Sequence, residues 1–177
     1  GIAGNFVLAA AGVGVSVLAL RDNNLKMIAL YEKVKAADTS GVGTYDRLKD
    51  LQVFVSQHMN ATPPKLGSNP GIQLVETYKR AKTAETARVT AERERIYNEA
   101  ISFCEAALPQ SLLSQRAQCI IDRNASQTVT ERQIVPDLYR YDFVSPRWSP
   151  DLAGWSIIIS IVLVGILLLQ ILARIVS

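Results

Sequence analysis

The side chains that most often build metal and catalytic sites are scarce in this chain of 177 residues. It contains one histidine, His58, and two cysteines. A single histidine without a Cys, Asp or Glu at ligand spacing does not form a metal site. The chain also lacks the GxSxG, HExxH, CxxC and phosphate-loop patterns. We therefore predict that it is not an enzyme and that it has no catalytic residues, no metal site and no cofactor.

A surplus of charge of one sign is missing as well. The middle of the chain, residues 21–151, holds eighteen of the nineteen Lys and Arg residues and all sixteen acidic residues, so its formal charge is +2. Proteins that bind nucleic acid usually show a basic patch or stripe, and a sequence pI near 9.0 does not replace one. We expect no nucleic-acid partner.

Two long hydrophobic blocks stand on either side of this polar middle, at residues 2–20 and 152–176. About 20 apolar residues are enough to cross a bilayer as a helix. Residues 157–169 contain no polar side chain except Ser160, and a helix that is apolar on all sides is typical of a membrane span. We predict a transmembrane helix at residues 152–176.

The first block predicts another transmembrane helix, at residues 1–20, with a secretory signal sequence as the alternative. The block lacks a basic start and a cleavage site before Arg21, which favours a retained span with further residues upstream. Small residues at four-residue spacing let a second helix approach closely, and the other span is the candidate partner, although such spacings also arise by chance in an alanine-rich segment. The spaced residues are Ala10 with Gly14 and Gly12 with Ser16.

Amphipathic helices are expected in the first part of the middle. In residues 23–38 the apolar side chains recur every three or four residues, and no helix breaker separates this segment from the first span. A second helix is predicted at residues 44–60, after a break at residues 39–43. The side chains expected to face inward are Met27, Leu30, Tyr31 and Val34 in the first helix, and Tyr45, Leu48, Leu51, Val55 and Met59 in the second.

A long helix is predicted at residues 72–108, after a connection rich in proline and glycine at residues 61–71. The helix segment contains neither Pro nor Gly, and it would be about 50 Å long at 1.5 Å per residue. Val89, Ile96 and Phe103 recur every seven residues, which indicates coiled-coil packing against a neighbouring helix.

Ion pairs at helical spacing accompany this segment. Glu85 with Arg88 and Glu92 with Arg95 stand three residues apart, so they lie on the same side of a helix turn. We interpret both pairs as solvated support for the helix rather than as a binding site.

Cys104 and Cys119 are the only cysteines, and an even count in an exported domain favours a disulfide. A helix that ends near Leu108 and a second one from Ser111 to about Arg123 would bring the two thiols together. Two unpaired small residues are the alternative. A bridge that closes a loop of this length would stabilise the fold by about 3 kcal/mol.

Aromatic and basic side chains crowd the segment before the second span. Tryptophan and tyrosine favour the headgroup level of a bilayer, and arginine can reach lipid phosphates. Ser149 or Asp151 would cap the span. We interpret the segment as a membrane-interface collar, with a ligand site of stacked aromatics as the alternative. The interface residues are Tyr139, Arg140, Tyr141, Arg147, Trp148 and Trp155.

Three stretches carry a resemblance to other proteins. They are YDFVSPRWSPDLAG at residues 141–154, SQHMN at residues 56–60, and IYNEA at residues 96–100 with the cysteine that follows. In them the chain resembles small two-span membrane proteins of unknown function from ultrasmall candidate-phylum bacteria. The resemblance covers most of the chain. It implies a bacterial cell-envelope setting, and it implies no activity, ligand or site.

The expected fold class is an all-α membrane protein. Two transmembrane helices would flank an antiparallel bundle of three to four helices at residues 21–124 and an extended juxtamembrane segment at residues 125–151. Arg174, the only charged side chain in the last turn of the second span, favours the cytoplasm. Both ends of the chain would then lie inside a bacterial plasma membrane, and the bundle would lie outside.

Two functions fit these features. The first is a structural or accessory subunit of a cell-envelope assembly. Its partners would be the lipid bilayer and membrane or envelope proteins, including further copies of the same chain. The alternative is an extracytoplasmic sensor or ligand-binding module that signals through a separate membrane partner.

Overall fold

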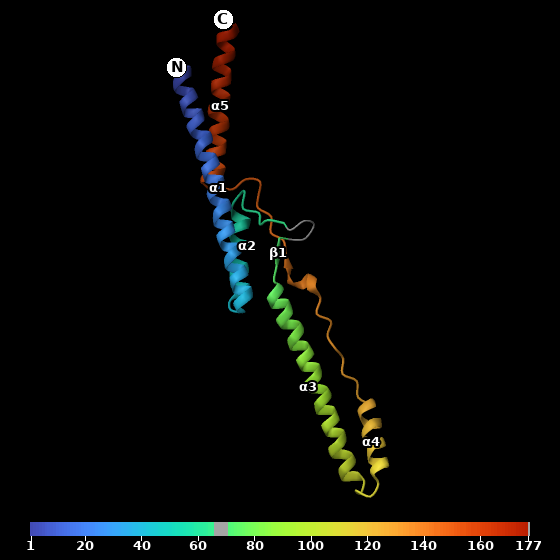
Figure 1. Cartoon of the computed structure of the whole chain (residues 1–177). Coiled ribbons are helices and arrows are strands. Elements are labelled where there is room, and N and C mark those ends of the chain that lie inside the picture. Colours follow the sequence, from blue (N-terminus) through green and yellow to red (C-terminus); the bar gives the residue numbers. More distant parts are fainter. Residues whose placement is uncertain (66–70, 177) are drawn as a thin grey trace. The chain divides into compact units, whose positions relative to one another are not determined.

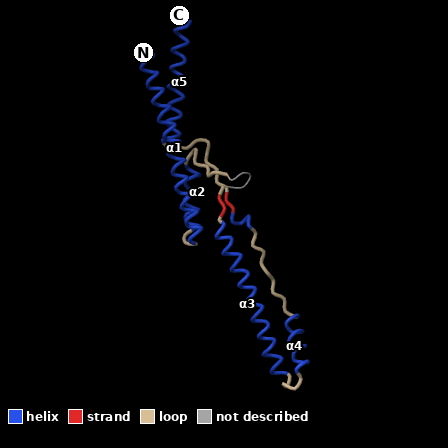
Figure 2. Tube along the Cα trace, in the orientation of Figure 1, coloured by secondary structure: helices blue, strands red, loops and turns tan. Residues whose placement is uncertain are grey.

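The computed structural model describes residues 1–65 and 71–176 and forms two compact units. The first unit comprises Gly1–Leu74 and Tyr139–Ser177, and the second comprises Val75–Leu138. Helices dominate both units (Figures 1 and 2). In chain order, the elements are α1 (Ile2–Ser40), α2 (Thr44–Gln57), β1 (Ile72–Gln73), α3 (Val75–Ala107), α4 (Leu113–Ala125), the 3-10 turn η1 (Pro136–Tyr139), β2 (Arg140–Tyr141) and α5 (Leu152–Val176).

Helix α1 is one continuous helix of 39 residues. It contains the first hydrophobic block and the amphipathic segment after it, so the expectation that nothing separates the two is confirmed. It ends where Gly41 adopts φ 77° and donates its backbone N–H to the Ala37 carbonyl at 2.8 Å. Gly43 has φ 66°. Both glycines occupy the left-handed region, where a side chain is strained, and this explains the predicted break.

Helices α1 and α5 run antiparallel, with both chain ends at the same end of the pair (Figure 1). Each is long and apolar enough to span a membrane. Their outward side chains are large and apolar. Examples are Phe6 at 61% exposed and Leu169 at 68% exposed. The structure is therefore that of an all-helical protein with two candidate membrane spans.

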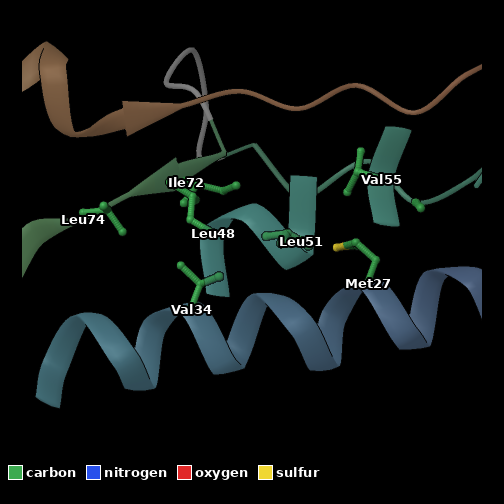
Figure 3. Close-up of a cluster of buried hydrophobic side chains, with 8 residues drawn as sticks. Met27, Val34, Leu48, Leu51, Val55, Ile72 and Leu74 are labelled. Carbon is green, nitrogen blue, oxygen red and sulfur yellow. The ribbon is translucent and has the colours of Figure 1, made fainter. Parts of the chain in front are cut away.

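The hydrophobic core of the first unit lies beyond the apolar part of α1, between the second half of that helix, α2 and β1 (Figure 3). Tyr45, which we expected to face this core, is 57% exposed. That expectation is wrong, because Tyr45 stands in the first turn of α2, out of line with Leu48 and Leu51. The buried cluster is Met27, Val34, Leu48, Leu51, Val55, Ala61, Ile72 and Leu74.

Two predicted helix boundaries in the first unit are wrong. Helix α2 ends at Gln57, because His58 is extended and Asn60 adopts a left-handed conformation. Ile72 and Gln73 form strand β1, antiparallel to β2, rather than the start of α3 (Figure 2). Ile72 and Leu74 bury their side chains in the core. An extended backbone puts alternate side chains on one side, which a helix would not do.

The second unit pairs α3 with α4. A disulfide joins Cys104 to Cys119 with a Cα–Cα distance of 6.0 Å, as predicted. The heptad prediction for α3 holds in part, since Val89 and Ile96 are buried. Phe103 is 49% exposed instead, and the Arg123 guanidinium lies 3.7 Å from its ring centroid. The predicted bundle at residues 21–124 is divided between the two units, and a single bundle stays a prediction.

Candidate interhelical seam and juxtamembrane junction

One side of α1 carries small or polar side chains at alternating spacings of four and three residues, which is a heptad pattern. All of them are buried or half-buried, whereas the residues between them are mostly exposed. We call the contact between this side of α1 and the facing side of α5 the seam. Its residues on α1 are Asn5, Ala9, Gly12, Ser16, Ala19 and Asn23, and those on α5 are Ala153, Ser156, Ser160, Leu163, Leu167 and Gln170.

Only one of the two predicted small-residue pairs lies on the seam. A Cβ atom added to Gly12 would stand 3.0 Å from Ser160 Oγ and 3.7 Å from its Cα, and Ser16 is buried. Ala10 and Gly14 are exposed, and a Cβ on Gly14 would meet no atom within 4 Å. Gly12 therefore lets the backbones of α1 and α5 approach closely, and Gly14 does not take part.

Three cross-helix polar contacts mark the seam at its two ends and between them. Asn5 Nδ2 donates to Gln170 Oε1 at 2.8 Å. The hydroxyl oxygens of Ser16 and Ser160 lie 3.1 Å apart. Asn23 Nδ2 donates to Asp151 Oδ2 at 2.8 Å. Such pairs contribute about 0.6 kcal/mol each between membrane helices, and each also specifies one register of α1 against α5.

The two serine hydroxyls in the middle of the seam have two protons for three possible hydrogen bonds. Ser16 Oγ lies 3.0 Å from the Gly12 carbonyl, and Ser160 Oγ lies 2.7 Å from the Ser156 carbonyl. Two hydroxyl protons serve these two contacts and the contact between the hydroxyls. At most two of the three hydrogen bonds form at once, so the cross-helix bond competes with a bond inside one helix.

A polar junction joins three segments of the first unit where α5 begins. Asn23 on α1 donates to the Met59 carbonyl at 3.2 Å as well as to Asp151. Ser149 is fully buried; its hydroxyl accepts the Met59 N–H at 3.0 Å and donates to Asp151 Oδ1 at 2.9 Å. Asp151 also accepts the Gly154 N–H at 2.9 Å. Asp151 is therefore the residue that caps α5.

The environment of the Asp151 carboxylate acts in two directions on its pKa. Burial raises the pKa, whereas the hydrogen bonds from the Gly154 N–H, Asn23 and Ser149 lower it. The net result is a lowered pKa. The junction therefore holds Asp151 in its charged form, which suits the positive N-terminal end of α5.

The turn after α2 is tied to α1 by a second set of bonds. Asn60 has φ 58°, and its Nδ2 donates to the Leu20 carbonyl at 3.0 Å. Asparagine tolerates this left-handed conformation better than other residues with side chains. The contacts of Asn23 and Asn60 with other segments were not predicted from the sequence. The available signal was that Asn23 continues the spacing of the small residues on α1.

The predicted interface residues separate into two groups. Trp148 and Trp155 lie together at the start of α5, with ring centroids 5.8 Å apart in an edge-to-face arrangement, and both are exposed. A Cβ on Gly154 would lie 1.8 Å from the Ser149 carbonyl oxygen, so only glycine fits at position 154. Arg147 is exposed as well. Tyr139 and Tyr141 instead pack against the hydrophobic core, and Arg140 beside them is half-buried.

In the second unit, Glu85 fastens the chain that follows α4 to α3. The Glu85 side chain is 8% exposed; it accepts two hydrogen bonds from Arg88, at 2.9 and 2.6 Å, and the Arg132 N–H at 2.7 Å. Arg88 also donates to the Thr130 carbonyl at 2.8 Å. The hydrogen bonds that Glu85 accepts from Arg88, and after them the one from the Arg132 N–H, lower the pKa of Glu85 to about 2. The interpretation of this pair as solvated is therefore wrong.

The Glu92–Arg95 pair is exposed on both sides, as we expected for a solvated pair. Within residues 1–65 and 71–176, no group of three His, Cys, Asp or Glu residues stands where it could hold a metal ion.

Comparison with protein-family models, with curated proteins and with solved structures found no match.

Proposed function

We propose that the protein is a non-enzymatic membrane protein with two spans, and that it acts as a structural or accessory subunit of a cell-envelope assembly. Helices α1 and α5 form its anchor, and the seam supports this role because its polar groups are paired within the chain. The remaining helices lie on the outer side of a bacterial plasma membrane and contact other subunits.

The observation that carries the proposal is the exposure of α4. None of the residues of this helix is buried, although the helix is amphipathic and the disulfide holds it to α3. Leu113 is 73% exposed and Ile121 is 59% exposed. With Ala117 they stand four residues apart and form one apolar stripe. A helix that is fastened in place and presents an apolar stripe to water is typical of a contact surface for another protein.

The test is the size of the complex that the tagged chain forms when it is extracted from native membranes in mild detergent. We expect a complex larger than the monomer. Changing Leu113→Lys together with Ile121→Lys should release the monomer. Changing Gln115→Lys together with Gln118→Lys adds the same charge on another side of α4 and should leave the complex intact. A stable monomer in the unchanged protein contradicts the assembly role.

The side of the membrane is tested separately, through the disulfide. After reduction of intact cells, an impermeant thiol reagent should label Cys104 and Cys119 if the second unit lies outside. Labelling that appears only after the membrane is broken would reverse the proposed orientation.

The continuity of α1 favours the sensor as a second candidate. The helix runs without interruption from its apolar part to Met27 and Val34 in the core, so a displacement of the core would move the span. A monomer in detergent that binds a small molecule, and whose binding shifts the contacts between α1 and α5, would favour the sensor over the subunit.

A further inference from the structure

A groove of about 520 Å³ lies beside the start of α5 and joins apolar to charged side chains. All of its lining residues belong to the first unit. Its apolar end includes Leu18 on α1 and Leu152 on α5, and its polar end includes Asp22, Lys26, His58 and Asp151.

The position of the groove along the two spans decides what can enter it. Leu18 stands just before Arg21, the first charged side chain after the hydrophobic block of α1. Asp151 is the last charged side chain before the hydrophobic run of α5. If the two helices span a bilayer, the apolar end of the groove faces hydrocarbon and the polar end lies at headgroup depth. A ligand of matching polarity is a phospholipid.

His58 gives the polar end a hydrogen-bond acceptor. Its Nδ1 lies 2.9 Å from the Phe54 carbonyl oxygen. Because a carbonyl can only accept, Nδ1 carries the proton of the neutral ring, and Nε2 is an acceptor. The ring stacks on Phe54 with centroids 4.1 Å apart, which fixes its orientation. Among the residues that the structure describes, none donates a hydrogen bond to Nε2.

The charged groups complement a headgroup that carries both signs. Lys26 and Asp22 form an exposed ion pair at 2.8 Å, and Asp151 adds a second carboxylate. The carboxylates and Nε2 of His58 suit a donor of positive charge, and the Lys26 ammonium suits a phosphate. An anionic headgroup would have only Lys26 as a partner and would face two carboxylates.

We propose that this groove binds the headgroup of a phospholipid with a primary ammonium, of the phosphatidylethanolamine type. The ammonium donates to His58 Nε2 and interacts with the carboxylates, and the phosphate pairs with Lys26. This inference rests on the membrane placement under the proposed function, and it adds a lipid site that the subunit role does not require.

The experiment measures lipid retention by native mass spectrometry, with the full chain in mixed micelles. The micelles contain equal amounts of phosphatidylethanolamine and phosphatidylcholine with identical acyl chains. The choline headgroup has the same charge but no N–H donor. We expect the ethanolamine lipid to be retained about tenfold more often, which is the effect of one charge-assisted hydrogen bond.

Two variants assign the preference to the groove. His58→Phe keeps a ring to stack on Phe54 but removes both nitrogens, so the retention of the two lipids should become equal. Lys26→Gln should lower ethanolamine-lipid retention several-fold. Its control is Lys35→Gln, because Lys35 forms a comparable exposed pair with Glu32 on the same helix and does not line the groove.

Equal retention of the two lipids by the unchanged chain overturns the proposal, and so does a preference that survives in His58→Phe. Flotation of the chain with vesicles is measured first. A chain that does not float contradicts the membrane placement, and the lipid site with it. A chain that floats but shows no preference overturns the lipid site alone.

Discussion

A single carboxylate, Asp151, caps α5 and binds α1 through Asn23. Changing it to alanine removes the cap and leaves the Asn23 amide with the Met59 carbonyl as its remaining partner. Loss of a helix cap costs about 1 kcal/mol, and we expect Asp151→Ala to lower the free energy of unfolding of the first unit by at least this amount.

Chemical denaturation in detergent, followed by Trp148 and Trp155 fluorescence, measures this loss. Asp50→Ala is the control, since Asp50 forms an exposed pair with Arg47 on α2. Equal effects of the two substitutions would show that Asp151 has no special role in the junction.

Glu85 carries the clearest pH dependence. Its pKa falls from an ordinary value of 4.5 to about 2 in the folded chain, so the unfolded chain binds the proton more readily. The stabilisation from Glu85 is therefore complete above pH 4.5 and is lost as the pH falls toward 2. Because Glu85 accepts the Arg132 N–H, we expect the segment after α4 to loosen over this range.

The exchange rate of the Arg132 amide hydrogen reports on this bond directly. Glu85→Gln should lower the protection factor of this amide, which is its slowing relative to the unfolded chain at the same pH, and should remove most of the acid dependence of that factor. Glu92→Gln should leave it unchanged, because the Glu92 carboxylate pairs with Arg95. An Arg132 amide that exchanges equally fast in all three proteins would contradict the role of Glu85.

At the scale of elements, the seam makes opposite predictions for two glycines of α1. Gly12→Leu places a large side chain where a Cβ already stands 3.0 Å from Ser160 Oγ. Overpacking of this kind costs about 1–3 kcal/mol, so α1 and α5 should separate more easily. Gly14→Leu adds the same atoms where a Cβ meets nothing within 4 Å and should be close to neutral.

Disulfide trapping measures the contact between these helices. Cysteines at Ser16 and Ser160, whose hydroxyl oxygens lie 3.1 Å apart, should cross-link readily in the parent and in Gly14→Leu, in a background without the native cysteines. The yield should fall in Gly12→Leu. A similar fall in both variants would mean that the seam does not lie where the structure has it.

Local signals explain which elements were predicted. The break after α1 follows from Gly41 and Gly43, and the disulfide follows from the spacing of Cys104 and Cys119. Strand β1 has only two residues, and its partner β2 lies far along the chain. The strand is therefore too short to show an alternating hydrophobic pattern in the sequence. Helix propensity continues through Ile72 without a breaker, but burial of Ile72 and Leu74 in the core overrides it.

The candidate site was less predictable than the helices for a related reason. Asn23, Ser149 and Asp151 are polar residues just outside the two hydrophobic blocks, and such residues are usually solvated. Their importance comes from the Met59 backbone, which Asn23 and Ser149 both contact. The role of Glu85 was hidden for a similar reason. Its pairing with Arg88 can be predicted from the sequence, but its hydrogen bond from the Arg132 N–H cannot.

At the scale of the whole molecule, the two units differ in what holds them together. The first unit has a cluster of eight buried hydrophobic residues. The second buries mainly Val89, Ile96, Ala100 and the bridged Cys104 along α3, and α4 buries none of its residues. The first unit is therefore held by a core, and the pairing of α3 with α4 depends on the disulfide.

Reduction of the disulfide should consequently act on one unit only. The bridge is worth about 3 kcal/mol in the loop-entropy description. A helix of 13 residues with no buried side chain is not stable alone, because isolated helices of about 12–15 residues are marginal in water. We expect α4 to lose most of its amide protection on reduction, while the amides of Leu51 and Val55 in α2 keep theirs.

Hydrogen exchange of the reduced and oxidised chains, compared segment by segment, decides this prediction. Replacing both cysteines by alanine should reproduce the reduced pattern, which separates loss of the bridge from side effects of the reductant. If the protection of Leu51 and Val55 falls together with that of α4, the two units unfold as one, and the core of the first unit then depends on the pairing of α3 with α4. If α4 stays protected without the bridge, its apolar stripe is already covered, and the assembly surface must lie elsewhere on the chain.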